Sequence, residues 1–79
     1  MVTKQTNYYD SSMIESSSYD FKHKILTVHF TGATYVYHNV DPQTHSDFAN
    51  AESQGKALNE FIKGKFEFEK INLEVSNGQ

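Results

Sequence analysis

The strongest constraint on the fold is a pattern of apolar and polar residues on both sides of Gly32. Before it, apolar residues alternate with polar ones, as in a strand with one buried face: Leu26, Val28 and Phe30 against Thr27, His29 and Thr31. After it, residues 34–40 are rich in strand-forming types. Gly32 would occupy the first central position of a two-residue loop, where a type II′ turn requires a positive φ. The sequence therefore predicts an antiparallel hairpin.

The loop length also predicts which side chains share a face of the sheet. A loop of residues 32–33 places Tyr35 opposite Phe30 on the neighbouring strand. Two residues further along, Tyr37 falls opposite Val28. Both Tyr rings then lie on the apolar face of the hairpin, and the other face is polar. We therefore expect the Tyr pair on the core side of the sheet.

The rest of the chain predicts an α+β fold. The Ser-rich segment 11–19 is expected to form a strand before the hairpin. After the hairpin, Asp41-Pro42 has the residue types of an N-cap and a first helical position. A second short helix is predicted over 57–62, ended by Gly64 in the left-handed region. Residues 66–75 alternate but change parity, so we expect a small antiparallel sheet of three or four strands with two short helices packed on one face.

The length and composition point to one small intracellular domain. A chain of 79 residues has room for a single core. It has no Cys, hence no disulfide framework and no thiolate zinc site, which favours a reducing cytoplasm. No segment approaches the ~20 apolar residues of a membrane span, and residues 1–10 are polar with no apolar h-region. We expect a flexible arm over 1–10, one domain over 11–75 and a frayed end over 76–79.

The charge restricts how the chain can bind nucleic acid. Its formal net charge is −3, with seven Lys and no Arg. An acidic chain cannot rely on broad counterion release, and without Arg it has no bidentate donor for guanine or phosphate. Binding would have to use a local patch, for which Lys56, Lys63 and Lys65 are the candidates. The alternative is that these lysines are solvated on a helix and its C-terminal end.

No catalytic, metal or cofactor site is predicted. The serines between residues 11 and 18 belong to no assignable Ser-His-acid arrangement and to no glycine-flanked elbow. His29 and His38 fall on the polar face of the hairpin without a carboxylate or Cys partner nearby. Two such imidazoles make a poor metal site. We therefore expect no enzyme activity and no small-molecule cofactor.

Several short motifs follow one another along the chain. They are Tyr19-Asp20, Leu26-x-Val28-x-Phe30, Gly32, Tyr35-Val36-Tyr37, Val40, Phe48, Ala51, Ser53-x-Gly55-Lys56, Asn59 and Ile62-Lys63-Gly64-Lys65-Phe66. In this ordered series the chain resembles the KTSC domain family over roughly 11–71. The family takes its name from the C-terminal extension of certain lysyl-tRNA synthetases and also occurs as short stand-alone bacterial and phage proteins. Members often carry Arg after the helix, where this chain has only Lys.

The resemblance implies a binding module for which RNA or tRNA is the suggested ligand. Tyr35 and Tyr37 could stack on unpaired bases, or they could be core residues with their hydroxyls at the rim; the register favours the core. Together with the three lysines and Asn59, which belongs to the matched segment, they are our candidate ligand-binding residues. The alternative is a protein-interaction module, such as a small phage-encoded protein that binds a host protein, either as a monomer or as a homodimer. The acidic charge favours this alternative.

Overall fold

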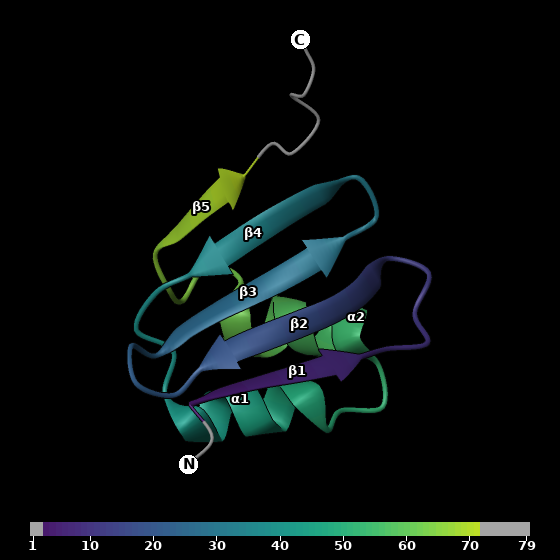
Figure 1. The fold of residues 1–79 in the computed structure, drawn as a ribbon. Coiled ribbons are helices and arrows are strands. Elements are labelled where there is room, and N and C mark those ends of the chain that lie inside the picture. The colour runs from purple at the N-terminus through teal and green to yellow at the C-terminus, as the bar shows by residue number, and fades with distance from the viewer. Residues whose placement is uncertain (1–2, 72–79) are drawn as a thin grey trace, which may run out of the picture.

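The structure is a computed structural model that describes residues 3–71. It contains a five-stranded antiparallel sheet in the order β1-β2-β3-β4-β5, with helical segments between β4 and β5 that pack behind one face (Figure 1). The elements are β1 (Lys4–Tyr8), β2 (Ile14–Asp20), β3 (Ile25–Phe30), β4 (Ala33–Tyr37), α1 (Pro42–Ala49), α2 (Gln54–Ala57), the π-helical η1 (Leu58–Ile62) and β5 (Phe68–Ile71). The expected α+β class is confirmed.

The expected number of strands, three or four, is wrong. The additional strand, β1, lies within the segment 1–10 that the sequence suggested to be an arm, and it pairs with β2 from Lys4↔Asp20 to Tyr8↔Ser16. Its residues are almost all polar, so no apolar alternation marks it. Backbone pairing holds it at the edge of the sheet, supplemented by a 3.1 Å hydrogen bond between the hydroxyls of Thr6 and Ser18.

The central hairpin forms, but its register differs by two residues from the predicted one. Tyr35 pairs with Val28, Tyr37 pairs with Leu26, and the loop is Thr31-Gly32. Gly32 therefore occupies the second central position, where its φ of 93° corresponds to a type II rather than a type II′ turn. A shift of two residues leaves every side chain on its predicted face, because side chains alternate with a period of two.

The helices are held by their caps. Asp41 accepts a hydrogen bond from the backbone N–H of Thr44, and Pro42 is the first helical residue, as predicted. The second helical segment begins at Gln54 rather than at residue 57, because the Ser53 side chain caps it by accepting from Lys56 N. It ends after η1, where Gly64 has a φ of 78°. This is the left-handed conformation that the sequence predicts for this glycine.

The core lies between the sheet and the helices. Most of its fully buried apolar side chains come from two strands and two helical segments: Ile14 and Tyr19 of β2, Leu26 and Val28 of β3, Phe48 of α1 and Ile62 of η1. Tyr37 is only 2% exposed, in agreement with its predicted place on the core side. β5 is the short strand expected near the C-terminus, but the rest of the predicted alternation, like the frayed end 76–79, lies outside the described residues. Within residues 3–71 no helix is long and apolar enough to cross a membrane.

Candidate functional site

The helices do not cover the whole inner face of the sheet. In Figure 1 they lie behind the β1–β3 side, whereas β5 forms the opposite edge. Phe68 lies on the helix-facing side of β5, because it pairs with the buried Tyr37. Its side chain is nevertheless 56% exposed. An aromatic part of the inner face is therefore open to solvent.

Successive side chains of β5 point to opposite faces of the sheet, so its positive and negative charges lie on different faces. Lys70 pairs with Tyr35 and so lies on the same face as Phe68, whereas Glu69 pairs with Val36 and lies on the opposite face. Each of these β5 side chains is exposed. The helix-facing side of β5 thus presents an aromatic ring and a cation, and its carboxylate lies on the other side of the sheet.

A cleft of about 340 Å³ opens beside these residues, between β4, β5 and the end of η1. Its lining consists of Tyr35, Tyr37, Lys63, Gly64 and Phe68, and we call it the aromatic cleft. The ring centroid of Phe68 lies 5.8 Å from that of each Tyr, at tilts of 39° and 38°. The two Tyr rings are 6.3 Å apart and nearly parallel, at 17°. The cleft therefore has aromatic walls with Lys63 at its rim.

The Tyr residues contribute unequally to the aromatic cleft. Tyr37 is buried and forms its floor, while Tyr35 is half-buried. Burial raises the pKa of the Tyr37 phenol above its ordinary value of 10.0, with a smaller contribution from Tyr35. The Tyr37 hydroxyl therefore stays protonated near neutral pH. The cleft consequently has one basic side chain, Lys63, and no ionised phenol at its floor.

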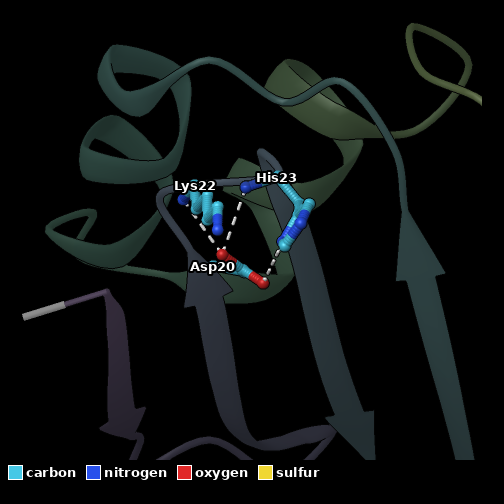
Figure 2. Close-up of polar contacts among 3 residues, drawn as sticks. All are labelled: Asp20, Lys22 and His23. Atoms are coloured by element: carbon cyan, nitrogen blue, oxygen red, sulfur yellow. Dashed lines mark hydrogen bonds and ion pairs between the residues drawn. The ribbon is translucent and has the colours of Figure 1, made fainter.

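A second hollow lies at the end of the sheet where the β2–β3 turn approaches the start of β5. It measures about 880 Å³, and its polar lining includes His23, His38, Glu67 and Glu69. Figure 2 shows the turn beside it: Asp20 Oδ1 accepts hydrogen bonds from the backbone N–H groups of Lys22 and His23. The His23 ring, whose Nδ1 lies 2.9 Å from Asp20 Oδ2, makes the largest contribution to lowering the pKa of that carboxyl. This hollow has acidic side chains, which the aromatic cleft lacks, and Phe68 lines both hollows.

The two histidines that the sequence placed on the polar face make separate contacts. His29 Nδ1 lies 3.2 Å from the hydroxyl of Thr34, and His38 Nε2 lies 4.0 Å from a carboxylate oxygen of Glu69. In the part of the chain that the structure describes, no three His, Cys, Asp or Glu side chains gather into a group that could hold a metal ion.

Comparison with known proteins agrees with the motifs and the fold. The sequence profile of the KTSC domain matches residues 10–66. The chain belongs to the KTSC domain family. A KTSC domain protein from Yersinia pestis has a crystal structure that superposes with a TM-score of 0.81, at 36% identity, over 87% of this chain and 99% of that one. The shared fold covers essentially the whole of that protein.

Two kinds of relative carry a similar KTSC sequence. A lysine–tRNA ligase of Nostoc punctiforme is 42% identical over 64 residues, which are 80% of this chain and 11% of the ligase. A protein of Tsukamurella paurometabola is 43% identical over 58 residues, covering 72% of this chain and 87% of that protein. This KTSC chain thus corresponds to a small part of the ligase and to most of the shorter relative.

The KTSC fold brings some of the predicted site residues together and separates others. Tyr35, Tyr37 and Lys63 meet in the aromatic cleft. Lys56 instead lines a different hollow, of about 240 Å³, on the helical side. The remaining two candidates, Asn59 on η1 and Lys65 beyond Gly64, are exposed and line neither hollow.

Sequence reasoning missed two residues at this site, Phe68 and Lys70. The alternation of residues 66–69 marks a strand in the sequence, but it does not show which strand lies beside it. The pairing of β5 with β4 supplies that information and places Phe68 against the Tyr pair. Phe68 and Lys70 therefore join the candidate residues.

Proposed function

We propose that this KTSC domain is a non-catalytic module that binds single-stranded RNA in the aromatic cleft. The observation that carries the proposal is the meeting of Tyr35, Lys63 and Phe68 at one open site, with Lys70 beside Tyr35 on the same face. Single-stranded nucleic acids bind where exposed aromatic rings stack on bases and cations follow the backbone, and each stacked base adds about 1–3 kcal/mol. The site offers both features within a few residues.

The distribution of charge supports an anionic ligand at this site. The net charge of −3 opposes binding of RNA over the whole surface. On β5, however, Lys70 lies on the side of the cleft and Glu69 on the other side of the sheet. A phosphate at the cleft would therefore meet Lys63 and Lys70 first.

The relatives also support RNA as the ligand. The ligase of Nostoc punctiforme, by its name, acts on tRNA, and the 64 residues that match this chain are 11% of that ligase. A domain attached to such an enzyme is suited to holding RNA near it. We extend RNA binding to this chain because it carries the residues of the aromatic cleft itself.

A titration with labelled RNA tests the proposal. The protein is titrated into a fluorescein-labelled single-stranded RNA, with unlabelled tRNA as competitor, and binding is followed by anisotropy at several salt concentrations. Two phosphate contacts, by Lys63 and Lys70, predict a slope of log affinity against log salt of about −1.4. Replacing both by Gln should remove most of that slope. Replacing Lys22 and Lys56, two exposed lysines outside the cleft, should leave it unchanged.

The aromatic part of the site has its own matched variants. Phe68→Ala should weaken binding by the value of one stacked base, whereas Tyr8→Ala should not, because Tyr8 is 84% exposed on β1 at the other edge of the sheet. Equal losses in both variants, or no binding to either RNA at low salt, would refute the proposal. The protein-interaction alternative would then be pursued by identifying host proteins retained on immobilised wild-type protein but not on a Phe68→Ala variant.

A further inference from the structure

We infer that the aromatic cleft accepts one unpaired nucleotide at a time and does not distinguish among the four bases. This inference rests on the RNA-binding function proposed above and adds the size and the selectivity of the site. Three properties of the lining support it: its volume, the number of rings available for stacking, and the kinds of polar atom.

The volume admits one base. The cleft measures about 340 Å³, which has room for a nucleobase. The limit to one base comes from the rings that are exposed for stacking.

The exposed aromatic rings also leave room for only one base to stack. Tyr37, at 2% exposure, can touch a ligand only as part of the floor. Phe68 contacts the Tyr pair from one side, since both Tyr centroids lie 5.8 Å away and only 6.3 Å from each other. Its remaining side is free for one base to stack, with the half-buried Tyr35 at the edge.

The polar atoms of the lining do not form a pattern that could identify a base. Discrimination between bases uses paired donors and acceptors, most often on Arg, Lys, Asn, Gln, Asp or Glu side chains. Among the described residues, the cleft is lined only by two Tyr, one Lys, one Phe and one Gly. Lys63 and Lys70 would contact phosphates, which carry no sequence information. Stacking holds the base, and any base can stack.

Hexanucleotides with abasic positions test this inference. The first probe is U6, the second has one uracil and five abasic positions, and the third is fully abasic. Loss of the single stacked base should make the fully abasic probe about 5- to 150-fold weaker than U6. The one-uracil probe should be at most about sixfold weaker than U6, the statistical factor for six equivalent positions. A6 and C6 should bind within about tenfold of U6.

Each of the other possible results with these probes would contradict one specific step of the inference. A one-uracil probe as weak as the abasic probe would show that several bases are needed, and a preference above tenfold for one homopolymer would show base readout. Equal binding of U6 and the abasic probe would remove stacking altogether. Failure of every probe, and of tRNA, would reject the RNA-binding function itself. Phe68→Ala should bring U6 to the affinity of the abasic probe, and Phe68→Tyr, which keeps a ring, should not.

Discussion

His45 should make the domain sensitive to mild acid. This α1 residue is only 3% exposed, and its ring stacks on Tyr19 with centroids 4.3 Å apart and an interplanar angle of 7°. Its Nε2 is buried without a hydrogen-bond partner in the described structure. Burial lowers the pKa of His45 below its ordinary value of 6.5, because the charged imidazolium would lose its hydration there.

The sign of the pH effect follows from this lowered pKa. Well above pH 6.5 the imidazole is neutral in both the folded and the unfolded chain, so His45 adds no pH dependence there. Below pH 6.5 the unfolded chain binds a proton that the folded chain does not. The free energy of unfolding then falls by up to about 1.4 kcal/mol per pH unit, until the pH reaches the folded-state pKa. A domain of this length has a total stability of roughly 4–12 kcal/mol, so the loss is readily measured.

Urea denaturation followed by circular dichroism measures this loss at pH 7.5, 6.5, 5.5 and 4.5. His45→Phe keeps a ring against Tyr19 and removes the titrating group, so its stability should stay nearly level across this range. His38→Gln is the matched control and should retain the wild-type loss. Hydrogen bonds, chiefly from His23 to Asp20 and from Thr44 to Asp41, lower the pKa values of these two carboxyl groups. Their contributions to the free energy of unfolding are therefore lost only below about pH 3.8, outside the range measured.

Two results would contradict this reasoning about His45. One is a His45→Phe variant that loses stability below pH 6.5 as steeply as the wild type. The other is an imidazole pKa at or above 6.5, measured by NMR titration of the folded protein. Either result would mean that water or a proton acceptor reaches Nε2 in the folded state.

Two further predictions concern the hairpin. Tyr37→Ala should lower the free energy of unfolding by about 3–5 kcal/mol, because it empties a buried site. Tyr8→Ala, at an exposed position, should change urea denaturation little. Equal denaturation of both variants would contradict the core position of Tyr37. Gly32→Ala should lower the free energy of unfolding by about 1–2 kcal/mol, because φ is 93° there. Gly55→Ala, within α2 and without a close contact, should lower it less. The reverse order in urea denaturation would contradict the turn geometry.

The hairpin was predictable because its signals are local. The period of two in β3 identifies the buried face, and a glycine between two strand-like runs identifies the turn. Neither signal decides whether Gly32 takes the first or the second central position, since types II′ and II place a positive φ at different positions. The predicted register was therefore wrong by two residues while the facing of Tyr35 and Tyr37 was right.

β1 was missed for a different physical reason. A strand at the edge of a sheet, with polar side chains on both faces, is held mainly by backbone hydrogen bonds, which any sequence can form. The segment from Lys4 to Tyr8 has no apolar periodicity. Only the presence of β2 beside it, with Ser18 opposite Thr6, makes the strand favourable. Such a partner is not visible in the segment itself.

The candidate site depends on a long-range pairing that local patterns cannot reveal. More than thirty residues, including all the helical segments, separate Tyr35 from Lys70, its partner on β5. Seven lysines in an acidic chain suggested a patch around the helix, yet Lys56 faces a different hollow from Lys63. The charge that matters to a ligand is the charge on one face of one strand. On β5 that face carries Lys70 and Phe68, so the chain can be acidic overall and still present a cationic aromatic site.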